Sequence, residues 1–237
     1  MGIPRPPAAA VSVAVRAALA VMAIASAGCS LGQGTGEVKS DSLYAAECWL
    51  GRPFDLQPDF FAAVPFRDTL AVRVQRGTDL QEVSDGLAVL IDDTRAMRVG
   101  GNLNGKELCV SLPPGVEIPG APPVGTVAPD PLANGVCNDQ YLVHAALYLG
   151  ASCHNQNTTL YAVSGTIVFD SMFSGDPNED DAVDKLIEAR SFTFQMGDPR
   201  DAPDGAPPTE IPADKLTTVT GSFSFYFERG QPGQPFP

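Results

Sequence analysis

The sequence predicts an all-β protein, an antiparallel β-sandwich whose strands are joined by long loops rich in proline and glycine. Two segments near the C-terminus carry the clearest signal. Ser191 to Met196 alternates polar with apolar residues, and Ser222 to Glu228 does so with three phenylalanines. Strict alternation puts every second side chain on the same face of a strand, so each segment should bury one row and expose the other. We therefore expect an antiparallel meander with one face in water.

Weaker patterns predict further strands. Thr69 to Gln75 alternates, and Gly86 to Ile91 is a continuous apolar run, which is typical of a strand buried on both faces. Gln140 to Leu149 fits a strand or a helix, and its tyrosine, valine and leucine content favours a strand. Leu160 to Met172 is expected to be a strand with a bulge or bend at Gly165.

Loops take up much of the chain, which has 23 glycines and 22 prolines among its 237 residues. Asn104-Gly105 is a tight-turn signal, and Asp181 to Ala189 fits a short helical turn. Arg52 to Phe66 is expected to be an irregular strand or a hydrophobic flap. The proline-rich stretch 113–131 could separate two domains, but neither side looks complete alone. We therefore predict one sandwich with a long crossing loop.

The N-terminal residues have the pattern of an export signal. Arg5 and Arg16 supply positive charge, and the apolar run Ala17 to Ala27 follows. This run is shorter than the roughly 20 apolar residues that a membrane helix needs, and it ends in small residues that suit a signal cleavage site. The four residues Ser26-Ala27-Gly28-Cys29 resemble the lipobox of bacterial lipoproteins, with Ser26 where leucine is usual.

This resemblance implies a lipid anchor. In the family, the residues before the cysteine are removed and the cysteine receives lipid chains, so lipidation at Cys29 is expected here. The partner of the lipid would be a membrane of the bacterial cell envelope. Ser30 is not the aspartate that marks inner-membrane retention in some bacteria, which favours the outer membrane. An ordinary secretory signal followed by a chance cysteine is the alternative.

The predicted organisation follows from the leader and the loops. Residues 1–28 form the lipoprotein signal peptide, and residues 29–47 form a flexible tether because they contain a glycine-rich run and mixed charge. The β-sandwich domain spans 48–229. The last residues, 230–237, form an extended tail of proline and glycine.

Four cysteines follow Cys29, namely Cys48, Cys109, Cys137 and Cys153. An even number in an exported chain indicates two disulfides. Three pairings are possible, and we favour Cys48–Cys109 with Cys137–Cys153, because each bond then stays on one side of the proline-rich stretch. A crossed pairing that ties the two halves together is the second choice.

The charge balance limits the possible partners. The chain has 15 basic and 28 acidic residues, a formal net charge of −13, and removal of the leader makes it more acidic. Such a balance argues against nucleic acid and against electrostatic docking on anionic lipid. It names no protein or glycan partner.

Two segments contain residues that bind metals in other proteins. The acidic loop 174–184 offers oxygen ligands suited to calcium, but Asp181 and Ile187 stand where an EF-hand needs glycine and glutamate. This leaves a nonstandard calcium site or a solvated loop. Cys137, His144 and the pair Cys153-His154 lack the close spacing of zinc ligands. We assign no metal and no cofactor.

Catalytic motifs are equally weak. Val163-Ser164-Gly165 lacks the first glycine of a nucleophile elbow, and any serine triad would need His144 or His154. Tyr226 is the best candidate for an aromatic sugar platform, since it falls on the polar face of the last strand. The predicted function is therefore a lipid-anchored envelope protein with a structural or binding role and no catalysis. A carbohydrate- or calcium-binding surface module and a hydrolase with an unrecognised site are the alternatives.

Overall fold

The structure is a computed structural model that describes residues 34–46, 48–77, 80–97, 103–113, 143–153, 158–172, 185–227 and 236–237. Over these residues it contains one sheet of ten strands, and the sheet pairs are antiparallel. The strands are β1 (Gly34–Ala45), β2 (Trp49–Leu56), β3 (Phe60–Phe66), β4 (Thr69–Arg76), β5 (Asp85–Ile91), β6 (Glu107–Cys109), β7 (Val143–Leu149), β8 (Thr159–Ser171), β9 (Lys185–Gly197) and β10 (Thr217–Phe227). Short helical turns are η1 (Gln81–Val83), α2 (Thr94–Met97), η3 (Pro199–Asp201) and η4 (Ala213–Lys215).

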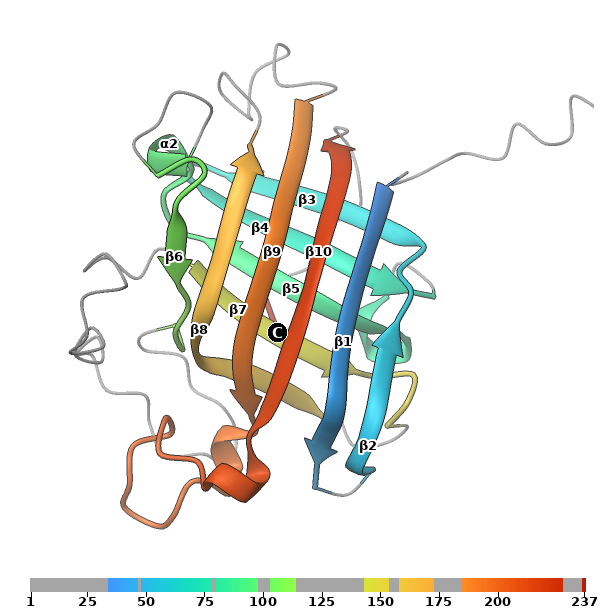
Figure 1. Cartoon of the computed structure of the whole chain (residues 1–237), viewed down its shortest axis with the longest axis vertical. Coiled ribbons are helices and arrows are strands. Elements are labelled where there is room, and N and C mark those ends of the chain that lie inside the picture. The colour runs from blue at the N-terminus through green and yellow to red at the C-terminus, as the bar shows by residue number, and fades with distance from the viewer. Residues whose placement is uncertain are drawn as a thin grey trace, which may run out of the picture. The chain divides into compact units, whose positions relative to one another are not determined.

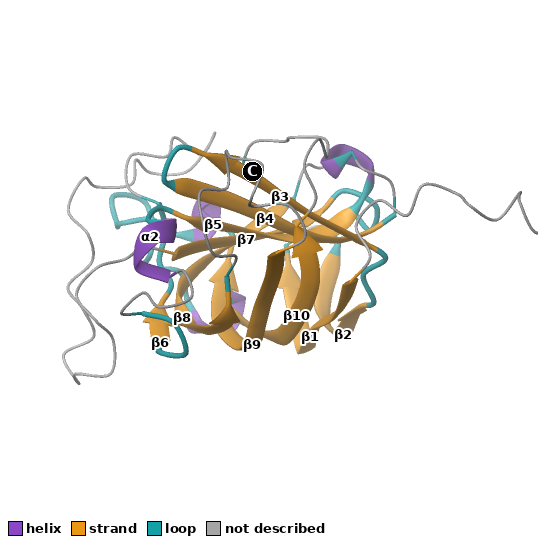
Figure 2. Cartoon of the chain, turned by 90° about the horizontal axis from the view of Figure 1, so that it is seen from above, coloured by secondary structure: helices purple, strands orange, loops and turns teal. Residues whose placement is uncertain are grey.

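The sheet curls over on itself and forms two layers. Its strand order is β2-β1-β10-β9-β8-β7-β5-β4-β3, with β6 paired to β8. The first layer contains β2, β1, β10, β9 and β8, and the second contains β7, β5, β4 and β3. Strands of the second layer run across those of the first (Figure 1), and the two layers are seen on edge in Figure 2. The predicted antiparallel sandwich-like, all-β fold is confirmed.

The layers are joined at the corner between β7 and β8. These two strands pair over only three positions, from Ala146 opposite Tyr161 to Tyr148 opposite Thr159. Beyond this short ladder β8 continues in the first layer, where it pairs with β6 and β9. One long strand can thus serve both layers without a crossing connection.

The core between the layers is built from the rows that the alternation predicted. Phe192 and Phe194 of β9 are buried and stacked with their ring centroids 4.8 Å apart. Phe225 of β10 contacts Phe61 of β3, with 5.7 Å between ring centroids, so aromatic rings bridge the two layers. Each fully buried side chain of this size stabilises the fold by about 2–3 kcal/mol through removal of apolar surface from water.

The strand expected within Gln140 to Leu149 is confirmed as β7 over its described part. Its odd-numbered residues, from Val143 to Leu149, belong to the core between the layers. The even-numbered residues, among them His144, point to the other face and are also buried. The burial on both faces explains why this segment shows no alternation of polar and apolar residues.

Two glycines allow the close approach that the core requires. A Cβ atom on Gly221 would lie 2.0 Å from the carbonyl oxygen of Glu37 and 2.5 Å from the Phe192 ring. Gly165 has a φ of +131°, and a Cβ there would lie 2.3 Å from the carbonyl oxygen of Thr193. The bend predicted at Gly165 is thus present, because few other residues adopt this backbone conformation.

The tether predicted over residues 29–47 is wrong in its second half. Gly34–Ala45 forms β1, which lies between β2 and β10 in the first layer. The glycine-rich start was interpreted as flexible, yet a Cβ on Gly34 would lie 2.6 Å from Phe225 and 2.9 Å from the Phe61 ring. Glycine here makes room for aromatic rings, a use that sequence composition does not distinguish from flexibility.

Two other expectations need correction. Arg52 to Phe66 is neither one irregular strand nor a flap, because it contains most of β2 and all of β3. The helical turn expected over Asp181 to Ala189 is also wrong in its described part, where β9 begins at Lys185. In both cases prolines and charges within the segment weakened the alternation that indicates a strand, although each strand pairs with a neighbour in the sequence.

The disulfide pairing that we favoured is wrong. Cys48 is bonded to Cys153, with 5.5 Å between their Cα atoms. The bond joins the two sides of the proline-rich stretch 113–131, which the favoured pairing kept apart. The curl of the sheet brings the turn between β1 and β2 beside the turn between β7 and β8. Cys109 is also disulfide-bonded, and its partner lies outside the described residues, as does Cys137.

The Cys48–Cys153 bond closes a loop with a sequence separation of 105. We expect the double variant Cys48→Ser, Cys153→Ser to lower the free energy of unfolding by about 4 kcal/mol, because the unfolded chain gains the entropy of the opened loop. Urea unfolding measures this change. Peptide mapping without reduction should recover the linked Cys48 and Cys153 peptides, and a Cys48–Cys109 peptide would contradict the assignment.

Candidate functional site

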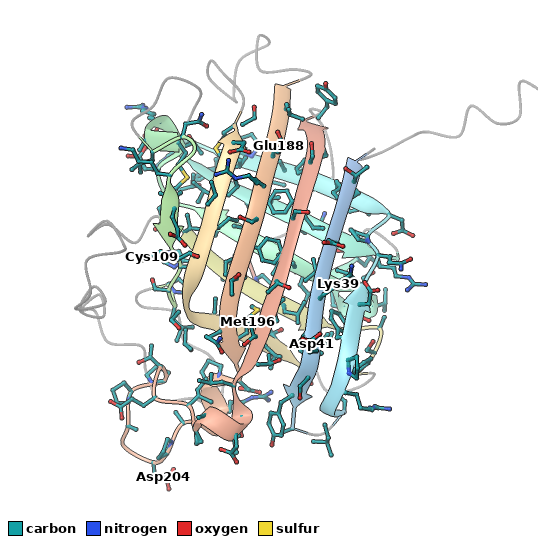
Figure 3. All side chains as sticks on the ribbon, viewed as in Figure 1. Lys39, Asp41, Cys109, Glu188, Met196 and Asp204 are labelled. Atoms are coloured by element: carbon teal, nitrogen blue, oxygen red, sulfur yellow. A yellow bond between two sulfur atoms is a disulfide. The ribbon has the colours of Figure 1, made fainter. Side chains whose placement is uncertain are left out.

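The outer face of the first layer carries regular rows of hydroxyl groups. Thr220 of β10 lies opposite Thr193 of β9, and Thr193 lies opposite Thr166 of β8. Along β10 the alternation places Thr218, Ser222 and Ser224 on this same face. We call it the hydroxyl face. Figure 3 shows its side chains, with Lys39 over β1 and Glu188 over β9.

A hollow of about 420 Å³ lies on the hydroxyl face. Ser224 forms its middle, directly opposite Thr35 of β1 on one side and Glu188 of β9 on the other. The hollow is lined by residues from four strands: Thr35, Gly36, Glu37, Asp170, Glu188, Ala189, Arg190, Ser222, Phe223 and Ser224. We call it the carboxylate hollow, because three of its side chains are acidic.

The charges of the carboxylate hollow do not cancel. Arg190 forms an ion pair with Asp170, with 3.1 Å between Nη1 and Oδ1. Glu37 pairs with Lys39, which stands farther along β1, outside the lining of this hollow. This hydrogen bond with Glu37 and its negative charge raise the pKa of Lys39. The hollow therefore offers carboxylate oxygens and hydroxyls to a hydrated ligand, and repels anions.

A second hollow, of about 310 Å³, lies farther along the hydroxyl face between β1 and the start of β10. Its floor contains a hydroxyl pair, Ser40 Oγ and Thr217 Oγ1, which are 2.9 Å apart. Thr217 Oγ1 also donates to the carbonyl oxygen of Ser42 at 2.9 Å. These hydroxyls are satisfied within the protein, so they join β1 to β10 and leave little capacity for a ligand.

His144 is buried and hydrogen-bonded through both ring nitrogens. Nδ1 lies 2.8 Å from the Ser111 carbonyl oxygen, and a carbonyl only accepts, so Nδ1 carries a proton. Nε2 lies 3.1 Å from Oδ2 of Asp92. The Ser111 hydroxyl is directed instead at the Leu112 carbonyl oxygen, at 3.5 Å. A triad histidine must have a nitrogen available for the serine hydroxyl, and the two nitrogens of His144 are engaged elsewhere.

A second buried polar group joins β7 to β4. The Tyr148 hydroxyl donates to Oε1 of Gln75 at 2.5 Å. The ring crosses β5 at Gly86, where a Cβ atom would lie 2.3 Å from the hydroxyl oxygen. Arg73, also on β4, stacks over Phe60 with 5.2 Å from its guanidinium carbon to the ring centroid. These contacts involve four neighbouring strands, β7, β5, β4 and β3, and no pattern in the sequence indicated them.

The predicted site residues have different outcomes. Cys29, Cys137, His154 and the acidic loop 174–184 lie outside the described residues. Cys153 is in a disulfide, so the zinc set that includes it is ruled out. Among the residues that the structure describes, no group of three metal-ligating side chains comes together.

Tyr226 lies on the polar face of β10, as predicted, and is 57% exposed. It is not among the residues that line the carboxylate hollow. The tyrosine extends instead beyond Ser224, toward the end of β10. A role as an aromatic platform over the hollow therefore gains no support from its position.

Comparison of the chain with protein-family models, with curated proteins and with solved structures finds no match.

The buried tyrosine makes a testable contribution to stability. Burial, with Asp85 nearby, raises the pKa of Tyr148 well above its usual value. The folded state then holds a proton that the unfolded state loses above pH about 10, so the free energy of unfolding should fall as the pH rises past that value. In Tyr148→Phe the free energy of unfolding should fall less as the pH rises past that value. At pH 7 the same variant should be less stable by about 1 kcal/mol, because the hydrogen bond to Gln75 is lost.

Urea unfolding between pH 7 and pH 11 measures both effects. Tyr226→Phe is the matched control, because it removes an exposed hydroxyl. Its free energy of unfolding should fall between pH 7 and pH 11 by as much as that of the native protein. An unchanged pH profile for Tyr148→Phe would contradict the role of the buried phenol.

Proposed function

We propose that this protein is a lipid-anchored component of the bacterial cell envelope, held in the outer membrane through Cys29, with a structural or binding role and no catalysis. One observation carries the proposal. The lipobox-like residues Ser26 to Cys29 end five residues before Gly34, where the sheet begins. A cleaved and acylated chain would thus pass from its lipid into a folded domain with almost no spacer.

The physical chemistry supports a lipid anchor. Each buried methylene contributes about 0.8 kcal/mol, so two or more acyl chains hold a protein durably on a bilayer. Disulfides, one of which is Cys48–Cys153, suit the oxidising compartments outside the cytoplasm.

A role without catalysis is supported by the geometry of the candidate groups. His144 uses both ring nitrogens in structural hydrogen bonds. The hydroxyl face offers many polar groups but places them in repeating rows rather than around one reacting atom. Such a face suits reversible contact with a hydrated surface.

The anchor has a direct test. In Cys29→Ser the acyl acceptor is lost, so the protein should move from the membrane to the soluble fraction of lysed cells. The intact mass of the native protein should show a chain that begins at residue 29 and carries acyl groups. Ser30→Ala is the control and should remain in the membrane fraction. A native protein with an unmodified and uncleaved N-terminus would reject the proposal.

A second candidate function is saccharide binding at the carboxylate hollow. The observation that favours it is the hollow itself, where carboxylates, hydroxyls and Arg190 converge from four strands. Sugar hydroxyls pair with such groups, and the surplus of carboxylates favours neutral or amino-bearing sugars over acidic ones. Binding and anchoring are compatible, since the hollow does not involve Cys29.

Glu188→Gln should weaken the binding of neutral and amino-bearing oligosaccharides about ten-fold, because a hydrogen bond to a charged group becomes a neutral one. Calorimetric titration of a panel of such sugars measures the change. Asp204→Asn is the control with matched charge, since Asp204 is exposed in the loop between β9 and β10 (Figure 3). If no sugar of the panel binds, or if both variants weaken binding equally, the hollow is not a saccharide site.

A further inference from the structure

Connectivity restricts which part of the domain can face the membrane. Four residues lie between Cys29 and Gly34, and the five residue steps of a fully extended chain span at most about 18 Å. Gly34 is therefore confined near the bilayer surface whenever Cys29 carries lipid. This step rests on the proposed function.

Gly34 belongs to one defined end of the first layer. It pairs with Phe225 of β10, which pairs in turn with Ile187 of β9. The start of β1, the end of β10, the start of β9 and the end of β8 lie together at the top of Figure 1. We call this the Gly34 end.

The second layer contributes its edge strand to the same end. Phe61 of β3 contacts Phe225, with 5.7 Å between ring centroids, and β3 crosses behind the Gly34 end in Figure 1. Among the described residues the strand order ends at β3, so one of its two edges has no strand partner there. The last residue of β3 is Phe66.

Two exposed aromatic side chains belong to strands of the Gly34 end, Tyr226 to β10 and Phe66 to β3. The described residues include five exposed large hydrophobic side chains, and the two aromatic ones are Tyr226, at 57%, and Phe66, at 66%. Tyr226 is the next residue after Phe225 on β10. Phe66 is followed by Arg67, whose guanidinium carbon lies 5.3 Å from the Phe66 ring centroid. Aromatic rings with a polar group or a cation beside them favour the level of the lipid headgroups.

The opposite end of the first layer carries a natural reporter. Trp49 is the one tryptophan of the chain, and it pairs with Ala45 at the far end of β1. Eleven residue steps of β1 separate Gly34 from Ala45, so Ala45 and its partner Trp49 lie about 37 Å from Gly34. A domain that stands on its Gly34 end would hold Trp49 well away from the bilayer.

We propose that the Gly34 end is the surface that docks on the lipid bilayer, with Tyr226 and Phe66 at headgroup level and Trp49 directed away from the membrane. The docked surface includes the free edge of β3. Contact with the bilayer would hinder pairing of that edge with a second chain, which is a common hazard of edge strands. The hydroxyl face is a lateral face of the first layer. Its carboxylate hollow adjoins the Gly34 end through Thr35 and Ser224, so the part that stays clear of the bilayer is the one farther along β9 and β10, around Thr193 and Thr220.

The test uses the complete lipid-bearing protein, reconstituted into phosphatidylcholine vesicles with brominated acyl chains. Tyr226→Trp and Phe66→Trp are each made in a Trp49→Phe background, which keeps a ring against Phe54. We expect each introduced tryptophan to lose about two-fold in fluorescence, and Trp49 of the native protein to keep its fluorescence. Both substitutions fall at exposed positions, and circular dichroism checks that the sheet is intact.

Every other quenching pattern overturns the orientation. Quenching of Trp49 alone would mean that the domain stands on its other end, and quenching at all three positions would mean that it lies flat. Absence of quenching in protein that floats with the vesicles would mean that the domain is held off the bilayer. Failure to float with the vesicles would reject the lipid anchor itself, so the two failures are distinguishable.

Discussion

The structure depends on the corner where β7 meets β8. Two rows of phenylalanines on β9 and β10 must leave water, and a single sheet cannot cover its own face unless it curls. The three-position ladder between β7 and β8 provides that curl. It turns β7, β5, β4 and β3 over the aromatic rows, so that Phe61 of the second layer reaches Phe225 of the first.

Several local features follow from this closure. Glycines at 34 and 221 occur where β1 and β10 must approach aromatic rings more closely than a Cβ atom permits. The turns that carry Cys48 and Cys153 become neighbours only after the sheet has curled, and their bond then stabilises the closed arrangement against the unfolded chain. On the outer side of the second layer, Tyr148 and Gln75 join strands through a buried hydrogen bond.

The same architecture relates the proposed anchor to the polar surface. The chain enters the sheet at Gly34, so the proposed lipid and the docked surface belong to one end of the first layer. The hydroxyl face forms the side of that layer, and the carboxylate hollow lies where this side meets the Gly34 end. Under the proposed function, two or more acyl chains would supply the membrane affinity, and the polar surface would face the envelope.

The sequence by itself determined the all-β class, the one wet face of the meander, the burial of Phe192, Phe194, Phe223 and Phe225, and the bend at Gly165. These are short-range properties, because alternation along one strand reports which side of that strand is buried. The lipobox-like motif at Cys29 is local in the same sense, and it alone points to the proposed anchor.

Only the tertiary structure decided which strands are neighbours, that Gly34 begins a strand, that Cys48 pairs with Cys153, and that His144 is occupied by Ser111 and Asp92. Each of these depends on residues far apart in the chain that meet when the sheet curls. A strand rich in glycine and charge, such as β1, shows its buried side only when the rings that pack against it are known.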